Sequence, residues 1–556
     1  MKKLLIAICA ITVVAIAGIG NFGAAREPNK NAMSNNMYLF NQIFKEVQAG
    51  YVDSLDADAL TRRAIDAMLS GIDPYTEYYP PEEVEDLTTI SSGTYGGIGS
   101  IISTRDGRVY ISHPTWGTPS RKAGLRHGDV ILEINGEAVD SGMPVDKVSR
   151  RLRGQAGSTV TVKVRRPWVE TDSILTFDLV RRNIEVNPLP FFGVDSAGVG
   201  YIRLTTFNNK SAGAVRDAVN AMKREGRLRG LILDLRSNGG GLLESAVQIV
   251  GLFVPKGTEV VRMRGSEDSG EKIYKTTRKP LDTEVPLVVM IDESTASSSE
   301  IVAGALQDLD RAVIVGSRSY GKGLVQSSRP LFNNGMVKIT TARYFIPSGR
   351  LIQAIDYRHR DSHGNPARIP DSLTKVWYTA AGRPVRDGGG ITPDVAVADT
   401  AMNRLLYNVI SDMWAYDFAN RFRARHDSIS VDWTVDDSVF ADFKAFIDPA
   451  RFKYDRMSEM GIDYLRDAAR LEGYLNDSVE AQIDRLAAMM RHDLQRDLDF
   501  NRDELIEIID GEISERYFDD GLLVKRSLRY DLEADTARAV VLDPVRYRAL
   551  LTPKSK

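Results

Sequence analysis

The sequence predicts a multidomain α/β protein that has a buried sheet and a helical C-terminal region. Between residues 183 and 395, short apolar runs alternate with helical patterns, which is typical of an α/β core with a buried sheet. From residue 396 onward the chain is charged, and its apolar residues keep helical spacing. The length of 556 residues leaves room for several buried cores.

Residues 1–25 have the pattern of a secretory signal. Lys2 and Lys3 precede an apolar run from Leu4 to Ile19, and small residues permit cleavage after Ala25. The run is long for a cleaved signal and short for a membrane span, so a retained N-terminal membrane anchor is the alternative. We therefore expect an extracytoplasmic protein, in the periplasm or cell envelope, that is either secreted or anchored.

Composition excludes several classes of protein. The net charge of −3 gives no reason to expect a nucleic-acid partner. The only cysteine, Cys9, lies in the signal, which excludes a thiol protease, a disulfide framework and cysteine-ligated zinc in the mature chain. None of the six histidines lies in the motifs of the α/β core, which argues against a Ser-His-Asp triad.

Residues 26–85 predict an N-terminal helical segment. Leu39, Ile43 and Val47 keep helical spacing, and the turn residues 71–74 end a second helix. An aromatic stretch follows at residues 75–79. It predicts either a small local core or the edge of a lid, and we favour the core.

Residues 86–182 combine three features of a peptide-binding module. Tyr95-Gly96-Gly97-Ile98-Gly99 is a glycine-rich loop whose successive backbone N–H groups can form an anion nest. Residues 121–139 predict a helix, a turn and a strand, and residues 158–166 alternate as a half-buried strand does. Together they resemble a PDZ domain. The resemblance implies that an extended peptide binds by strand addition, with its terminal carboxylate at Tyr95–Gly99.

Four apolar runs in residues 183–395 predict the strands of the core, and helices separate them. The strands are expected at 199–204, 230–235, 287–291 and 312–315, and the helices near 211–224, 242–253 and 298–309. Ligand sites on such sheets lie at the carboxyl ends of strands. The segments 236–241 and 294–300 both fall at such ends.

Serines and a lysine suggest a nucleophile at these strand ends. Residues 294–300, Ser-Thr-Ala-Ser-Ser-Ser-Glu, lie on a predicted strand-to-helix turn, which exposes hydroxyls near the positive end of a helix. Lys322 and Gln326 lie four residues apart, which on a helical turn places them on one face. A desolvated neutral lysine can take the proton of a serine hydroxyl without histidine. Serine hydrolysis is the chemistry that this pattern favours.

Two other interpretations compete with the serine–lysine pair. Serine-rich turns commonly cap helices without any catalytic role. Residues 316–323 also fit the phosphate-loop pattern G-x-x-x-x-G-K, but Gly323 replaces the hydroxyl residue that would bind magnesium. The acidic strand that would hold the metal, ending at Asp234, precedes this loop instead of following it.

Five motifs of this sequence resemble those of the carboxy-terminal processing peptidases. They are STASSSEI (294–301), YGKGLVQ (320–326), LILDLRSNGGG (231–241), SGRLIQ (348–353) and GITPD (390–394). That resemblance implies that Ser297 is the nucleophile, Lys322 the general base and Gln326 the residue that orients the lysine. It places the oxyanion hole at the backbone amides of Ser298, Gly240 and Gly241. Two departures are Ser298, where the family usually has alanine, and Gly239, where it has proline.

The function that we predict is a serine endopeptidase that cleaves extracytoplasmic proteins near their C-termini. Its partners would be protein or peptide substrates bound through their C-termini, and it would need no metal or other cofactor. The alternative is a catalytically silent PDZ scaffold that only binds C-termini.

Two regions have no assigned role. Residues 354–389 are a polar insertion that predicts a flap, an interaction hairpin or an inert surface loop. Residues 396–556 predict a helical region that serves internal packing, homo-oligomerisation or partner docking.

Overall fold

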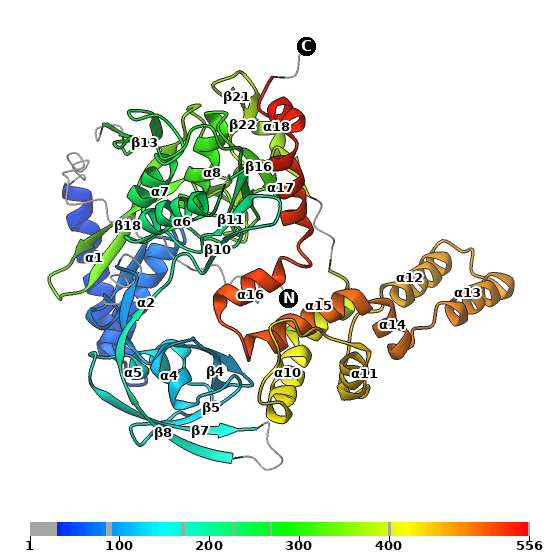
Figure 1. Ribbon diagram of the computed structural model, residues 1–556. Coiled ribbons are helices and arrows are strands. Elements are labelled where there is room, and N and C mark those ends of the chain that lie inside the picture. The colour runs from blue at the N-terminus through cyan, green and yellow to red at the C-terminus, as the bar shows by residue number, and fades with distance from the viewer. Residues whose placement is uncertain are drawn as a thin grey trace. The chain divides into compact units, whose positions relative to one another are not determined.

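The computed structural model describes residues 30–84, 92–167, 173–226, 228–266, 270–397 and 402–553 (Figure 1). The predicted signal and Cys9 lie outside these residues. The chain forms two compact units. The first contains residues up to 94, then 185–398 and 531 onward, and the second contains residues 95–184 and 399–530. Within the described ranges, no helix combines the length and apolar character needed to cross a membrane.

A six-stranded, mostly parallel sheet forms the centre of the first unit. Its order is β10-β11-β12-β15-β16-β23, and only the β10–β11 pair is antiparallel. Every residue of β12, β15 and β16 is buried, because helices cover both faces of the sheet. The predicted core strands are therefore confirmed. Their bounds are β10 Phe191–Val194, β11 Val199–Arg203, β12 Gly230–Asp234, β15 Leu287–Ile291, β16 Val313–Gly316 and β23 Val395–Ala396.

Three predicted helices cover one face of this sheet. They are α6 Ser211–Glu225, α7 Leu243–Val250 and α8 Ser298–Asp308. Alternate strand residues, such as Leu231, Leu233 and Val289, share one apolar core with these helices. Helix α8 is buried along its whole length. The end of β15 and the start of α8 are thereby fixed with respect to the sheet.

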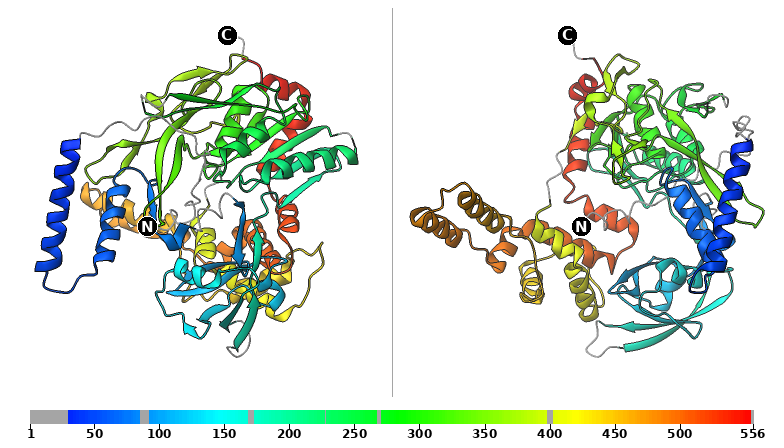
Figure 2. Two further views of the ribbon diagram at one scale, coloured as in Figure 1. Left: turned by 90° about the vertical axis from the view of Figure 1, so that its left-hand side faces the viewer. Right: turned by 180° about the vertical axis from the view of Figure 1, so that it is seen from behind.

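The C-terminal residues of the chain pack on the same sheet, which the sequence did not predict. Helix α17, Leu532–Leu542, contacts β11, β12, β15 and β16, and α18, Pro544–Leu550, follows it (Figures 1 and 2). The Leu287 amide donates to the Tyr547 hydroxyl at 2.9 Å. Arg236, just after β12, pairs with Asp531 and Glu533. The helical character predicted for the C-terminal region is confirmed, but its last part, residues 531–553, packs with the first unit.

Gly230 is the point of closest approach between α17 and the sheet. A Cβ at this position would lie 2.4 Å from Cγ1 of Val541. We expect Gly230→Ala to lower the free energy of unfolding by about 1–3 kcal/mol, because the helix must shift. Denaturant unfolding of the full chain measures this loss. Adding Val541→Ala should restore part of it, and Gly461→Ala, where a Cβ meets open space, should not destabilise. An unchanged stability in Gly230→Ala would contradict the tight packing.

A second sheet in the first unit carries segments from distant parts of the chain. Its order is β1-β18-β13-β14, and β17 also pairs with β18. Two N-terminal helices precede it, and two small hairpins fill the insertion 354–389. The bounds are α1 Lys30–Gly50, α2 Ala57–Ser70, β1 Glu77–Tyr79, β13 Glu259–Arg264, β14 Glu271–Lys275, β17 Leu324–Pro330, β18 Met336–Phe345, β19 Ile355–Arg360, β20 Pro366–Arg368, β21 Val376–Tyr378 and β22 Pro384–Arg386, with short 3-10 turns at Pro81–Glu83 and Asp371–Leu373.

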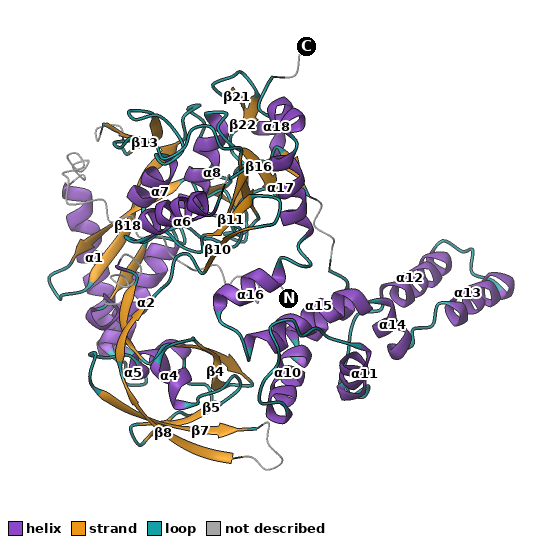
Figure 3. Ribbon diagram, in the orientation of Figure 1, coloured by secondary structure: helices purple, strands orange, loops and turns teal. Residues whose placement is uncertain are grey.

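The second unit begins with a PDZ-like region of strands and two short helices (Figure 3). Its sheet has the order β3-β4-β5-β7-β8, with β6 beside β5, and β2 pairs with β9. Strand β7 alternates between buried and more exposed residues, as predicted. The bounds are β2 Thr94–Gly97, β3 Ser100–Arg105, β4 Arg108–Pro114, α4 Pro119–Ala123, β5 Val130–Ile134, β6 Glu137–Ala138, α5 Val145–Leu152, β7 Thr159–Arg166, β8 Ser173–Val180 and β9 Arg182–Glu185.

Helices make up the rest of the second unit. Leu405, Leu406 and Val409 are buried in its core, as their spacing predicted, whereas Ile410 is exposed. The bounds are α9 Arg404–Ser411, α10 Trp414–Arg425, α11 Asp437–Phe446, α12 Met457–Leu471, α13 Asp477–Met489, α14 Leu494–Phe500, α15 Arg502–Glu515 and α16 Asp520–Ser527.

Candidate active site

Ser297 lies between strand β15 and helix α8 in an unusual backbone conformation. Its φ is +58° and its ψ is −114°, and only 4% of its surface is exposed. Non-glycine residues avoid such conformations because of steric strain, and strained residues concentrate at functional sites. The burial of α8 and β15 on both sides holds the turn in place.

The three consecutive serines have different surroundings. The Ser298 hydroxyl donates to the Gly241 carbonyl at 2.8 Å, and the Ser299 hydroxyl donates to the Asn238 carbonyl at 2.8 Å. Both side chains are buried and connect α8 to the glycine turn after β12. Of the three, Ser298 and Ser299 therefore have evident structural roles, whereas the strained residue is Ser297.

The glycine turn, residues 238–241, lies directly against the serines. A Cβ at Gly240 would be 3.0 Å from Cβ of Ser297 and 2.9 Å from the Ser298 nitrogen, so only glycine fits. The Gly240 amide, however, donates to Oδ1 of Asn238 at 2.9 Å. This bond contradicts the prediction that Gly240 offers a free N–H to an oxyanion. Ser298 is the first residue of α8, where N–H groups lack partners within the helix.

Glu300 is a functional candidate that sequence reasoning missed. Its buried carboxylate accepts hydrogen bonds from the amides of Ser297 at 2.8 Å, Gly321 at 2.7 Å and Lys322 at 2.9 Å. It also accepts one from the Ser319 hydroxyl. Burial raises the pKa of Glu300 to about 7, although these four hydrogen bonds oppose the shift. The spacing Ser-x-x-Glu at residues 297–300, typical of a helix capping box, was the available signal.

The Glu300 carboxylate thus binds the backbone of both predicted catalytic residues. Lys322 lies in the loop between β16 and β17, and only 4% of its surface is exposed. Burial is the main cause that lowers the pKa of Lys322 to about 7, and the nearby Lys338 lowers it further. Glu300, Glu77 and Asp73 oppose this shift. A large fraction of this amine is therefore neutral near pH 7.

The predicted helical turn between Lys322 and Gln326 is absent. Strand β17 begins at Leu324, because this segment pairs with β18 instead of coiling. Gln326 is buried, and its Nε2 donates to Oγ1 of Thr340 at 3.1 Å. Its predicted role in orienting the lysine stays a prediction.

Two segments far apart in the sequence cover Lys322. The ammonium nitrogen lies 4.2 Å from the centre of the Tyr75 ring, and the Tyr75 hydroxyl accepts a hydrogen bond from the Tyr357 hydroxyl at 3.3 Å. Tyr75 belongs to the aromatic stretch that we favoured as a local core, and Tyr357 belongs to the insertion. The insertion begins at Ala354, whose amide donates to the Gly321 carbonyl at 2.9 Å. Both segments therefore contribute to the burial that lowers the lysine pKa.

The predicted carboxylate loop of the PDZ-like region is anchored through its carbonyl groups. The Gly99 carbonyl accepts hydrogen bonds from the hydroxyls of Thr118 and Ser120, and the Ile98 carbonyl accepts one from the Ser120 amide. A Cβ at Gly96 would lie 2.2 Å from the Gly154 carbonyl oxygen. The Arg153 guanidinium lies 5.2 Å from the Tyr95 ring centre, which places positive charge beside the loop.

Comparison with known proteins agrees with this architecture. Residues 198–358 match the model of peptidase family S41, residues 112–166 match the PDZ domain, and residues 405–541 match a family described as "Probable PDZ-protease, C-terminal helical domain". The carboxy-terminal-processing protease of Bartonella bacilliformis is 36% identical over 319 residues, which cover 57% of this chain and 72% of that protein. The chain belongs to the carboxy-terminal-processing protease family. It is accordingly a serine peptidase.

Two further relatives of this protease were found. A probable CtpA-like serine protease of Staphylococcus aureus is 31% identical over 58% of this chain and 64% of that protein. Among solved structures, the photosystem II D1 C-terminal processing protease is 30% identical, with a TM-score of 0.36, over 65% of this chain and 92% of that one.

Proposed function

We propose that this serine peptidase is an endopeptidase that cleaves proteins near their C-termini through Ser297 and Lys322. The observation that carries the proposal is the shared Glu300 carboxylate, which accepts hydrogen bonds from the backbone amides of Ser297 and Lys322. The strained Ser297 and the lowered pKa of Lys322 add support, because a nucleophile needs a neutral base.

In this mechanism the neutral Lys322 amine takes the proton of the Ser297 hydroxyl as its oxygen attacks the scissile carbonyl. The Ser298 amide, with Gly241 as the second predicted donor, stabilises the negative charge on the carbonyl oxygen. The lysine then donates its proton to the leaving amine, and an acyl-enzyme remains. Water, activated by the same lysine, releases the acyl group and regenerates the serine. Gln326 positions the lysine in this proposal, and no step uses a metal or cofactor.

The PDZ domain would capture the C-terminus of the substrate by strand addition. Support comes from the loop at 95–99, whose carbonyls are held by Thr118 and Ser120, and from the charge of Arg153 next to it. In this proposal the apolar run Leu4–Ile19 directs the protein out of the cytoplasm. This run lies outside the described residues. Its substrates would then be extracytoplasmic proteins.

Peptides with a free or an amidated C-terminus test this capture. Amidation removes a charge-assisted contact, so we expect binding to the full chain to weaken about ten- to a hundredfold. Binding and cleavage of a matched acid and amide pair measure the difference. Gly96→Ala should reduce the difference in binding between the acid and the amide peptide, because the new Cβ meets Gly154. As a control, this variant should still be labelled by a serine-directed probe. Equal binding of both peptides by the wild-type protein would mean that the loop is only a turn.

A further inference from the structure

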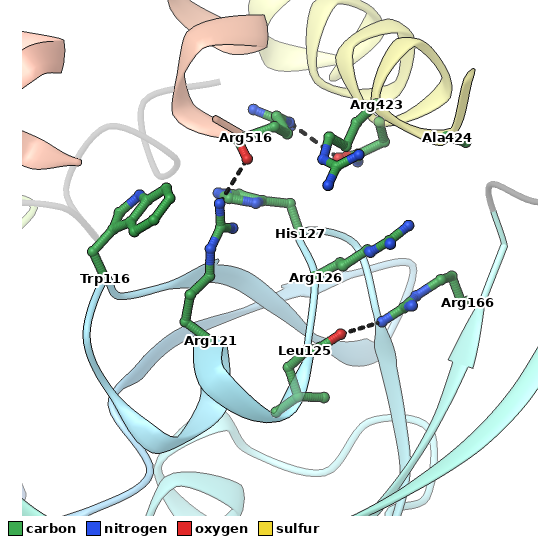
Figure 4. Close-up of a pocket in the computed structure, with 11 residues that line it drawn as sticks. Trp116, Arg121, Leu125, Arg126, His127, Arg166, Arg423, Ala424 and Arg516 are labelled. Carbon is green, nitrogen blue, oxygen red and sulfur yellow. Dashed lines mark hydrogen bonds between the residues drawn. The ribbon is translucent and has the colours of Figure 1, made fainter. Parts of the chain in front are cut away.

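The second unit contains a cavity between the PDZ domain and the helical region that the proteolytic function does not use. Its volume is about 310 Å³, and five arginines line it: Arg121, Arg126, Arg166, Arg423 and Arg516. Figure 4 shows that the first three come from the PDZ domain and the other two from the helices around it. The cavity is therefore strongly basic, and both parts of the unit build it.

Two of these arginines are neutralised by carboxylates. Arg166 makes two hydrogen bonds to the buried Asp129, each of 2.7 Å. Arg516 pairs with Glu512 at 2.7 Å. These two side chains are part of the internal packing and have no positive charge to spare.

Among the described residues, the other three arginines make no ion pair with a buried carboxylate, although Asp129 and Asp427 lie near enough to Arg126 to favour its charged form. Nη2 of Arg121 donates to the Arg516 backbone carbonyl at 2.6 Å, and its guanidinium lies 4.4 Å from the Trp116 ring centre. Within the described part of the chain, neither Arg121 nor Arg126 forms an ion pair. Arg423 contacts Asp427 at 3.4 Å, but that carboxylate is fully exposed to water.

The pKa shifts of Arg121 and Arg126 agree with a crowding of positive charge in the cavity. Burial is the main cause that lowers the pKa of Arg121 and of Arg126, and Arg423 lowers both values further. Like charges gathered in one cavity repel one another, and a bound anion would remove that repulsion. Guanidinium groups also match the geometry of phosphate and carboxylate oxygens.

A buried hydrogen-bond donor without a partner also lines the cavity. Nδ2 of Asn420 makes no hydrogen bond to the described residues, although only 4% of this residue is exposed. A buried donor left unpaired costs free energy, so such a group is rare unless a ligand or water satisfies it. The nitrogen itself has almost no accessible surface, so Asn420 belongs to the wall of the cavity and is not counted as a donor to a ligand inside it.

A metal ion is a poorer match for the same region. His113, His127 and Glu515 have ligand atoms within 4.8 Å of one another, which could hold a cation. However, Arg516 and Arg121 lie close enough to His127 to disfavour its positive form. Among the described residues Arg121 forms no ion pair, so its charge would oppose a metal cation, whereas it would attract an anion.

We propose that this cavity binds a phosphate group, with Arg121 and Arg126 of the PDZ domain and Arg423 of helix α10 as its donors. A doubly charged phosphate balances the charges of Arg121 and Arg126 better than a single carboxylate does. Because the donors come from both parts of the unit, the bound group holds the PDZ domain to the helical region. The site is independent of Ser297 and Lys322.

Inorganic phosphate and glycerol 3-phosphate are the soluble probes, added to the full-length Ser297→Ala protein. Titration calorimetry should detect saturable binding, and the melting temperature should rise more than it does in chloride of equal ionic strength. Flotation with phosphatidic acid vesicles, compared with phosphatidylcholine vesicles to account for binding through the apolar run Leu4–Ile19, distinguishes a lipid headgroup, which would bind only in vesicles, from a free phosphate. Both sources satisfy the proposal, and absence of binding to all three probes would overturn it.

Variants from each side of the cavity localise the site. Arg126→Gln and Arg423→Gln should each weaken phosphate binding about ten- to a hundredfold, since each removes a charge-assisted contact. Without phosphate, both should remain folded. Arg126→Gln relieves repulsion from Arg166 and Arg423 and should melt close to the parent, whereas Arg423→Gln also loses its contacts with the His426 carbonyl and Asp427 and should melt lower. Arg470→Gln, an equal charge change at an exposed residue of α12, should bind as the parent does. Undiminished binding in both cavity variants would overturn the site, and a loss confined to Arg126→Gln would overturn the bridging role.

Discussion

Ser297→Ala should abolish proteolysis, with a loss of at least about 10³-fold in turnover, because the hydroxyl is the attacking group. Ser298→Ala is the matched control, since it removes the neighbouring hydroxyl but keeps the backbone N–H proposed for the oxyanion hole. It loses only the bond to the Gly241 carbonyl, so we expect most of the activity to remain. Digestion of casein and labelling by a serine-directed probe measure both variants.

The outcome also separates the two candidate functions. A wild-type protein that neither cleaves casein nor reacts with the probe would favour the silent PDZ scaffold. Full activity in Ser297→Ala, combined with a loss in Ser298→Ala or Ser299→Ala, would assign the nucleophile to one of those two serines. The structure opposes that assignment because both hydroxyls already donate to backbone carbonyls.

Lys322→Met should be inactive and yet more stable than the wild type below pH 7. The fold lowers the pKa of Lys322 from 10.5 to about 7, so the charged form is destabilised in the folded state. Below pH 7 the lysine is charged in both the folded and the unfolded protein, and the folded protein bears the whole penalty. The penalty declines as the pH rises from 7 to 10.5. A shift of this size corresponds to at most about 4–5 kcal/mol.

Denaturant unfolding at pH 6 and pH 9 measures this effect. We expect Lys322→Met to gain at least about 1 kcal/mol at pH 6, which is less than the full penalty because Glu300 and Glu77 lose a favourable neighbour in the variant. The gain should be smaller at pH 9, where the penalty has declined. Lys256→Met, at an exposed lysine, should change neither the activity nor the pH dependence of stability. Lys322→Arg should be inactive, since guanidinium does not lose its proton in this range. An active Lys322→Arg protein would rule out the lysine as base.

The pH profile of the wild-type protease follows from the same group. Activity should rise as the pH passes 7, because the lysine must be neutral to act as base. Glu300 also titrates near pH 7, so the rising limb belongs to the coupled pair. In the Glu300→Gln variant, the side chain at position 300 no longer titrates. A rising limb that persists in this variant assigns the ionisation to Lys322, and its disappearance would assign it to Glu300.

Local sequence patterns determined much of this protein. The apolar runs at 230–235 and 287–291 predicted buried strands, because residues covered on both faces must all be apolar. The serine run and Lys322 were identified from their positions after strands and from the resemblance to the processing peptidases. These signals are short-range, so they can be found before the fold is known.

Tertiary structure decided what depends on contacts between distant residues. The C-terminal helix α17 has an ordinary helical pattern, and only packing assigns it to the sheet of the first unit. Gly240 was predicted to offer its amide to substrate, but Asn238 uses that N–H within the turn. The sequence marks Lys322 as a base candidate, but it does not reveal the burial that makes the amine neutral. Tyr75 and Lys338 approach it from separate segments. Burial and the charge of Lys338 lower its pKa, whereas the Glu300 carboxylate opposes the shift.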